Sequence, residues 1–269
     1  MGKMTLDDWQ KSVLPALRKA EYPTSNINRI TLLAYFFWDD DRINSKFYTI
    51  ECAILSAFRC FGKLKTILVV NRLTDQIKSF SRKYGIDLQI DVSLTGGIGA
   101  MNLDCIEKLP ERFSTDYVLI VESDGLPVNS GIERYLDTYD YVGAPWGRHT
   151  SWRRHLPYAK YLVGNSGFSL RSRRLCKRAS NLYRKFFKRL RFNWFLNNDV
   201  FCCRTLRMLF PSYRREFSFP TPEDAGRFSL ERNLECLSSS PPIGFHGEIG
   251  FQNYVSHYGI PFHELMPGT

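Results

Sequence analysis

The sequence predicts an α/β fold: a mostly parallel sheet flanked by helices, followed by a more irregular C-terminal half. Two observations carry this prediction. Between residues 29 and 126, short apolar runs of strand length alternate with segments whose apolar residues keep helical spacing. Such alternation is typical of parallel sheets with helices on both faces. The 269 residues, 43% of them hydrophobic, suffice for one large core, so we expect a single domain.

The first half divides into alternating helices and strands. Helices are predicted at 6–20, where Pro15 should break the helix, and at 47–61, 74–84 and 101–109. Buried strands are predicted at 30–38, 65–71, 87–94 and 117–121. The segment 95–100, TGGIGA, has none of the glycine patterns that cradle phosphates, so a plain turn is favoured over a border of the ligand site. Asp39–Asp41 fit a metal cluster or a helix start, and the helix that follows favours the latter.

The second half is less regular. We expect a helix and a short strand over 131–146, a turn and then a strand or helix start over 163–174, and a helix over 195–210. A basic amphipathic helix is predicted from Leu175, with Lys and Arg between its apolar positions. Its apolar stripe fits packing against the core and attachment to a membrane surface equally well.

The stretch from Asp116 to Gly125, DYVLIVESDG, attracts attention because a buried strand ends there in Glu122 and Asp124. Unpaired buried charge is costly. In open α/β sheets, ligands bind at the carboxyl ends of the strands. A divalent cation that holds a phosphate would therefore be a natural partner for these carboxylates.

The positive charge of the chain, +10 in net terms, is concentrated. Between Gly147 and Asn198 there are fourteen Lys and Arg residues and no Asp or Glu. This excess implies an acidic partner: nucleic acid, a phosphorylated small molecule, or an anionic membrane. No nucleic-acid-binding motif appears, so nucleic acid is the least favoured.

The compartment expected from the sequence is the cytoplasm. The seven cysteines contain no C-x-x-C pair, which argues against zinc ribbons and thioredoxin-like sites and favours buried, reduced thiols. No apolar run is long enough to cross a bilayer, and the first residues lack the apolar core of a signal peptide. We expect a soluble cytoplasmic protein, with peripheral membrane contact as an option through the basic segment 171–191.

Several segments together resemble an uncharacterised bacterial and viral group of GT-A-type glycosyltransferases. They are YDYVGAPW (139–146), VGNSGFSLRSRR (163–174), NNDVFCC (197–203), AGRFSLE (225–231) and IGFHG (243–247). The resemblance implies a GT-A-like (Rossmann-like) fold and transfer of a sugar from a nucleotide-sugar donor to a glycan or lipid-linked glycan acceptor. It assigns the donor to about 29–126 and the acceptor to about 127–265.

The resemblance also implies roles for individual residues. Asp124 would hold Mn²⁺ or Mg²⁺ against the donor diphosphate, with Glu122 at the first position of a D-x-D-like motif as a donor contact. His246 would be a second metal ligand, although a lone histidine is often structural. Asp199 would be the general base for the acceptor hydroxyl, although a helix N-cap explains it equally well.

Further positions belong to the pocket or to its charge. Trp146, Asn165, Ser166 and Gly167 would line the acceptor or sugar pocket, because an aromatic face stacks on a sugar ring and small residues let the backbone approach. Arg171 would offset the charge of the diphosphate. Two other functions remain open: a nucleic-acid-binding protein without activity, and a sugar nucleotidyltransferase, which would normally carry a glycine-rich phosphate loop absent here.

Overall fold

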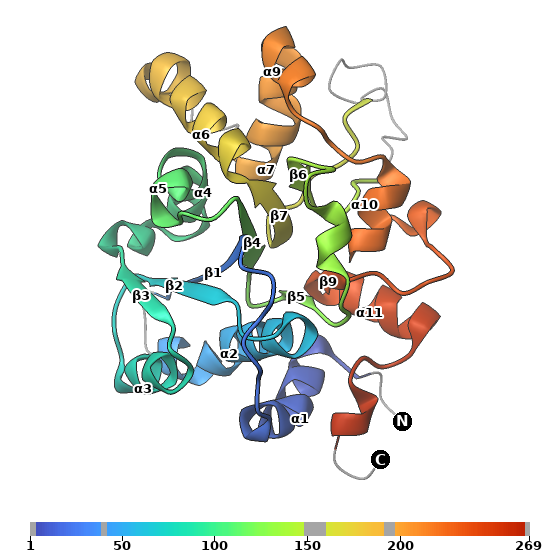
Figure 1. The fold of residues 1–269 in the computed structure, drawn as a ribbon. Coiled ribbons are helices and arrows are strands. Elements are labelled where there is room, and N and C mark those ends of the chain that lie inside the picture. Colours follow the sequence, from blue (N-terminus) through green and yellow to red (C-terminus); the bar gives the residue numbers. More distant parts are fainter. Residues whose placement is uncertain (1–3, 39–41, 148–159, 191–196, 267–269) are drawn as a thin grey trace.

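The computed structural model describes residues 4–38, 42–147, 160–190 and 197–266. Its centre is a six-stranded sheet in the order β3-β2-β1-β4-β7-β6 (Figure 1). Four strands are parallel: β1 (Ile30–Phe36), β2 (Lys65–Val70), β3 (Asp87–Ile90) and β4 (Tyr117–Val121). β7 (Phe168–Ser172) pairs antiparallel with β4, and β6 (Tyr141–Val142) with β7. The predicted α/β class with a mostly parallel sheet is confirmed.

Helices cover both faces of this sheet (Figure 1). On one face lie α1 (Leu6–Lys19), α2 (Arg42–Phe61) and α3 (Asp75–Tyr84). On the other lie α4 (Gly97–Glu107), α5 (Leu109–Arg112) and α6 (Arg173–Leu182). In β4, Leu119 packs with the first set of helices and Ile120 with the second, as the alternation of side chains along a strand requires.

A second, three-stranded sheet continues from β4. It has the order β5-β9-β8 and consists of β5 (Gly125–Pro127), β9 (Gly244–His246) and β8 (Ser229–Leu230). β5 follows β4 after a tight turn at 122–124 and pairs antiparallel with β9. α10 (Pro222–Phe228) leads into β8, and α11 (Gly247–Tyr258) begins directly after β9.

The remaining elements are short and fill most of the second half, in agreement with the irregular character predicted for it. They are η1 (Val92–Gly96), η2 (Ile132–Tyr135), η5 (Tyr183–Phe187), η6 (Lys188–Leu190), α7 (Asn198–Val200), η8 (Phe201–Thr205), α8 (Leu206–Leu209), α9 (Pro211–Glu216), η9 (Leu234–Cys236) and η10 (His263–Leu265).

Three predictions of local structure in the first half are wrong, each for a physical reason. Pro15 does not break α1, because the buried face of that helix packs on α2 and outweighs a local cost of about 3 kcal/mol. The third strand ends at Ile90, since the Asp91 side chain accepts a hydrogen bond from the Ser93 backbone and starts a 3₁₀ turn. The segment 95–100 is not a plain turn, because α4 begins at Gly97.

The basic amphipathic helix turns its apolar stripe inward. Leu175, Ala179 and Leu182 of α6 are buried in a cluster with the helices that follow Asn198. Because these three side chains are core residues, the part of the stripe on α6 does not face a membrane, whereas Phe186, its next position, is exposed. Asp39–Asp41 lie outside the described residues. The seven cysteines are free thiols, and all but Cys60 are buried. Within the described residues, no helix combines the length and apolar character that crossing a bilayer requires.

Candidate active site

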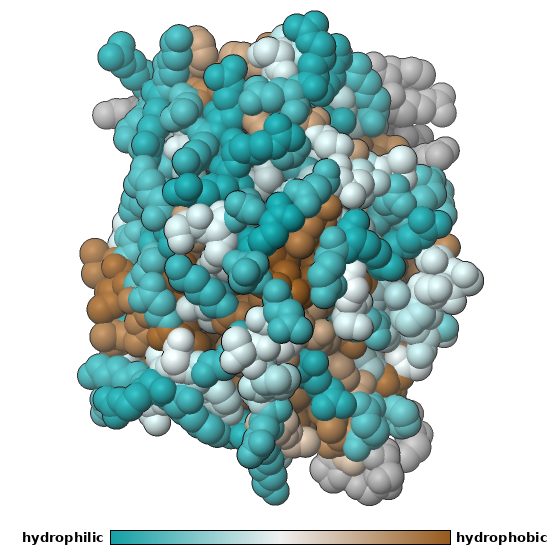
Figure 2. Space-filling view, in the orientation of Figure 1, coloured by the Kyte–Doolittle hydropathy of each residue, from teal (hydrophilic) through white to brown (hydrophobic). Residues whose placement is uncertain are grey.

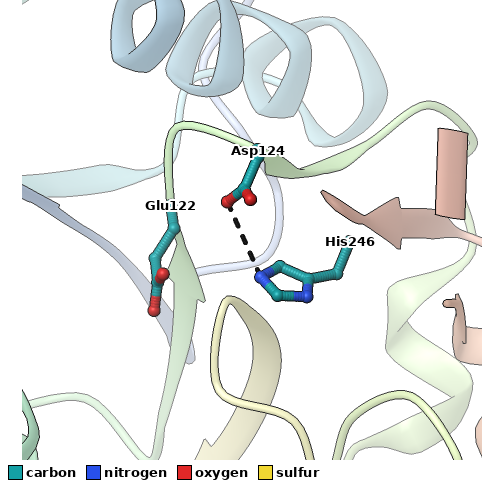
Figure 3. A group of neighbouring side chains, drawn as sticks. All are labelled: Glu122, Asp124 and His246. Carbon is teal, nitrogen blue, oxygen red and sulfur yellow. Dashed lines mark ion pairs between the residues drawn. The ribbon is translucent and has the colours of Figure 1, made fainter. Parts of the chain in front are cut away.

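Glu122, Asp124 and His246 form a cluster at the junction of the two sheets (Figure 3). One ligand atom from each lies within 4.8 Å of the others. His246 Nε2 is 3.6 Å from Asp124 Oδ1, and the Asp124 side chain is half exposed. Two carboxylates and an imidazole are ligands that suit a divalent cation such as Mn²⁺. The structure thus brings together three of the four side chains that the sequence proposed for the metal and diphosphate.

Close backbone contacts fix the positions of Asp124 and His246 in this cluster. His246 stands opposite Gly125 in the β5–β9 pairing, and the Gly247 N–H donates to the Asp124 carbonyl at 2.8 Å. A Cβ at Gly167 would lie 2.2 Å from His246 Nε2, and a Cβ at Gly125 would lie 2.2 Å from the Gly167 carbonyl oxygen. Glycine is required at both positions because a side chain would displace the histidine or the turn.

The charges in the cluster favour a cation. Burial lowers the pKa of His246, but Glu231, Asp124 and Glu122 outweigh burial and raise it to about 9. Burial raises the pKa of Glu122, and the neighbouring charge of Asp124 raises it further. The acidic side chains around His246 thus favour a positive charge at this position, which a bound metal ion would supply.

Glu231 is a site residue that the sequence analysis did not assign. Its Oε1 is 3.5 Å from His246 Nδ1, while Nε2 of the same ring faces Asp124. Burial raises the pKa of Glu231, yet the interactions with His246 and Asn165 leave it lowered. The sequence carried one signal, because Glu231 is the last residue of the AGRFSLE segment on which the family resemblance rests.

Asn165 links this cluster to Asp199. Its Nδ2 is 2.8 Å from His246 Nδ1, and its backbone N–H donates to Asp199 Oδ2 at 3.2 Å. The other Asp199 oxygen accepts from the Val200 N–H at 2.7 Å, in the first turn of α7. Burial raises the pKa of Asp199, although these backbone donors and Arg171 oppose the rise. The Asp199 carboxylate therefore accepts hydrogen bonds from two backbone groups and also faces the site, while the N-cap of α7 is Asn197.

Two cavities flank the cluster and share Glu122 and Ile98. The first, of about 340 Å³, lies at the carboxyl ends of β1 and β4 and includes Asp124. Its other lining residues are Tyr35, Phe36, Phe37, Trp38, Arg42, Gly97, Met101 and Ser123. Since Gly97 and Ile98 line it, the segment 95–100 borders this cavity, the alternative that the sequence left open.

The second cavity, of about 410 Å³, contains His246, Asp199 and Glu231. Trp146, Asn165 and Ser166 also line it, as the sequence predicted for a pocket, together with Asn102, Pro145, Gly147, Asn197 and Arg232. One face of the Trp146 ring is covered by the Arg204 guanidinium, 3.9 Å from the ring centre. Ser166 Oγ is 3.4 Å from Glu122 Oε1. Gly167, also predicted for the pocket, does not line this cavity; it packs against the His246 ring, where a side chain would not fit.

Arg171 does not line either cavity. Its side chain is 1% exposed, its Nη2 donates to Asn198 Oδ1 at 2.6 Å, and its guanidinium lies over the Tyr141 ring. Because its side chain is buried and lines neither cavity, Arg171 is not placed for the direct contact with the diphosphate that the sequence predicted. The charge instead sits beneath the site, where it opposes the rise in the pKa of Asp199.

A family model described as a protein of unknown function (DUF5672) matches residues 96–246. The match spans more than half of the chain, from the turn before α4 to His246. The chain belongs to this family. Every side chain proposed above as a metal ligand lies within the matched residues 96–246. No curated protein matches the chain.

Several solved structures with a similar fold are glycosyltransferases. One is GlyE from Streptococcus pneumoniae TIGR4, with 13% identity and a TM-score of 0.48 over 81% of this chain and 54% of that one. Another is the mannosyltransferase PcManGT from Pyrobaculum calidifontis, in complex with GDP-Man and Mn²⁺, with 15% identity and a TM-score of 0.38 over 64% and 53%. The chain spans about half the length of these two proteins. Each similarity is one of fold.

Proposed function

We propose that the protein is a glycosyltransferase that moves a sugar from a nucleotide-sugar donor to a glycan or glycolipid acceptor, assisted by Mn²⁺ or Mg²⁺. The observation that carries this proposal is the position of the Glu122–Asp124–His246 cluster between two cavities. A donor has a nucleoside, a diphosphate and a sugar in a row. A cation site between two cavities matches that order, because the diphosphate is the central charged part.

The side chains of the cluster fit a divalent cation. Asp124 and His246 would hold the ion, and Glu122 would bind it or a hydroxyl of the donor. The imidazole favours Mn²⁺ over Mg²⁺, which prefers oxygen ligands alone. A bound ion would neutralise the negative charge that develops on the leaving diphosphate. Glu231 would keep His246 turned with Nε2 toward the ion, as carboxylates near metal-binding histidines often do.

The first cavity is proposed to take the nucleoside. Four aromatic residues line it, and the Arg42 guanidinium lies 4.7 Å from the centre of the Trp38 ring. Aromatic faces accept a nucleobase by stacking, and a guanidinium suits phosphate or ribose oxygens. A volume of about 340 Å³ lies in the range of small-ligand sites.

The second cavity is proposed to take the sugar and the acceptor. Asp199 would accept the proton of the attacking hydroxyl if the reaction inverts the anomeric centre, and it would orient the acceptor if the reaction retains it. The raised pKa brings Asp199 closer to the values that serve a general base. Trp146, Asn165 and Ser166 would shape the pocket around the sugar. The buried positive charge of Arg171 would favour the ionised form of Asp199.

The test is hydrolysis of a panel of nucleotide sugars, including GDP-mannose and UDP-glucose, with Mn²⁺ present. We expect at least one donor to be hydrolysed, and Asp124→Ala to reduce the rate by about a hundredfold or more. Asp75→Asn, a change at a fully exposed carboxylate, is the matched control and should leave the rate unchanged. Folded protein that neither binds nor hydrolyses any donor would refute the proposal. Tight, salt-dependent DNA binding unaffected by Asp124→Ala would support the nucleic-acid alternative instead.

A further inference from the structure

Three large apolar side chains remain exposed where two helical segments meet. Phe186 is 45% exposed, Met208 41% and Leu209 51%. Phe186 lies in η5, and its ring is 5.4 Å from that of Phe210, the residue that directly follows Leu209. We call Phe186, Met208 and Leu209 the apolar tip. Large apolar side chains left exposed in neighbouring segments commonly mark a surface that contacts another molecule.

The chain around the apolar tip is strongly basic. From Lys177 to Arg215 the sequence has eleven Lys and Arg residues and a single acid, Asp199, which belongs to the candidate active site. The Lys185 ammonium lies 5.2 Å from the centre of the Phe186 ring. The surface over α6 and the helices after it is mostly hydrophilic in Figure 2.

Part of this positive charge has no acidic partner in the described structure. Arg184 pairs with Glu111 and Lys188 with Glu107, so these two cations are neutralised on the side of α4 and α5. Within the described part of the chain, no ion pair involves the cations at 185, 189, 214 and 215. An anionic partner would bind here without first breaking a salt bridge.

We propose that the apolar tip and its basic surroundings dock on an anionic lipid bilayer. The apolar side chains would enter the interface, and the unpaired Lys and Arg side chains would contact acidic headgroups. A second copy of the chain fits less well, because two strongly basic surfaces repel each other. Nucleic acid also fits less well, because Met208 and Leu209 are aliphatic and offer no stacking surface to bases.

The apolar tip is connected to the candidate active site by one continuous helical stretch. Asp199 lies in α7, and Leu209 ends α8, with η8 between them. Ten residues of helix span roughly 15 Å. Docking through Leu209 would therefore hold Asp199 no farther than about that distance from the lipid surface. The inference does not rest on the proposed sugar transfer, although a lipid-linked acceptor would be presented at such a surface.

The test is sedimentation of the full-length chain with vesicles of phosphatidylcholine, alone or mixed with phosphatidylglycerol. We expect binding only to the mixed vesicles, weakening as salt rises. Phe186→Ser with Leu209→Ser should reduce the affinity about tenfold or more, and Lys185→Glu should reduce it on anionic vesicles. The matched control is Ile90→Ser with Val92→Ser, an exposed apolar pair on β3 and η1, at the edge of the molecule where Figure 2 shows brown surface.

The control pair should bind vesicles as the unmodified chain does, and circular dichroism should show that every variant is folded. Equal binding to neutral and anionic vesicles, or no binding to either, would overturn the proposal. So would full vesicle binding by the folded Phe186→Ser, Leu209→Ser variant. Loss of DNA binding in that variant, with no vesicle binding by the unmodified chain, would assign the surface to nucleic acid.

Discussion

Asn165 is the residue that joins the two parts of the candidate site. It has a positive φ of 84°, which asparagine tolerates better than most side chains, and it contacts both His246 and Asp199. Its backbone conformation and its amide group therefore serve different purposes. The first shapes the turn that precedes β7, and the second reaches the imidazole.

Two substitutions separate these purposes. Asn165→Gly keeps the backbone conformation and removes the amide, whereas Asn165→Ala also adds left-handed strain. We expect both to reduce donor hydrolysis by about tenfold, because both lose the contact with His246. In urea unfolding, the alanine variant should be less stable than the glycine variant by about 1 kcal/mol. Full hydrolysis by the glycine variant would show that the amide has no role.

Glu231 is predicted to position His246 rather than to touch the donor. Glu231→Gln keeps the size of the side chain and removes its charge, so Mn²⁺ affinity should fall about tenfold or more. Electron paramagnetic resonance of free Mn²⁺ measures this affinity without any turnover. Glu223→Gln, at a carboxylate in the first turn of α10, away from the cluster, is the control. Unchanged affinity in Glu231→Gln would remove Glu231 from the metal site.

The role proposed for Asp199 predicts a loss of activity at acidic pH, the acidic limb of the pH profile. A general base works only when ionised, so kcat should fall as the pH drops through the pKa of Asp199, which burial raises above its ordinary value. The positive charge of Arg171 opposes this rise. Arg171→Met should therefore move the limb to higher pH, whereas Arg171→Lys should leave it nearly in place. If the limb stayed at the same pH in a folded Arg171→Met variant, Arg171 would have no influence on the pKa of Asp199.

At the residue scale, the sequence allowed Glu122, Asp124 and His246 to be proposed together, because a strand end supplied two of them and a motif supplied the third. Glu231 was not assigned, although its motif was noticed, because two residues of strand are too short to recognise as one. Arg171 was assigned to the diphosphate because sequence alone does not show that both faces of β7 are buried.

At the scale of elements, the turn between β4 and β5 holds the site together. A Cβ at Gly125 would collide with the Gly167 backbone, whereas a Cβ at Gly99, exposed in α4, would meet no other atom within 4 Å. Gly125→Ala should destabilise the protein by about 2 kcal/mol or more. Gly99→Ala should stabilise it by about 0.5–1 kcal/mol, since glycine is a poor helix former. Equal effects of the two changes in urea unfolding would contradict this account.

The parallel strands were predictable because each is an apolar run of the right length between helical segments. Pro15 and the segment 87–100 were not, because packing on α2 and one side-chain hydrogen bond decide these places. The inward direction of the stripe on α6 also depends on packing, with the helices that follow residue 198. Local pattern predicts the elements, but contacts distant in sequence decide where some of them begin and end.

At the scale of the whole molecule, one core joins the two sheets. Leu119 of β4 belongs to the same buried cluster as Leu126 of β5 and Phe245 of β9, and the Phe168 and Phe228 rings stack at 4.8 Å across the junction. The cluster of ligands therefore lies on a fixed joint between the sheets. The junction of the two sheets could not be predicted from the sequence, because β5, β8 and β9 have only two or three residues each.

The central claim is that Glu122, Asp124 and His246 hold a divalent cation against a nucleotide diphosphate. Calorimetric titration of the protein with UDP and GDP, with and without Mn²⁺, tests it most directly. We predict that Mn²⁺ tightens the binding of at least one of these nucleotides about tenfold or more, and that Asp124→Asn or His246→Gln abolishes the gain. Equal affinity with and without the metal, or a gain that survives Asp124→Asn, would contradict the claim.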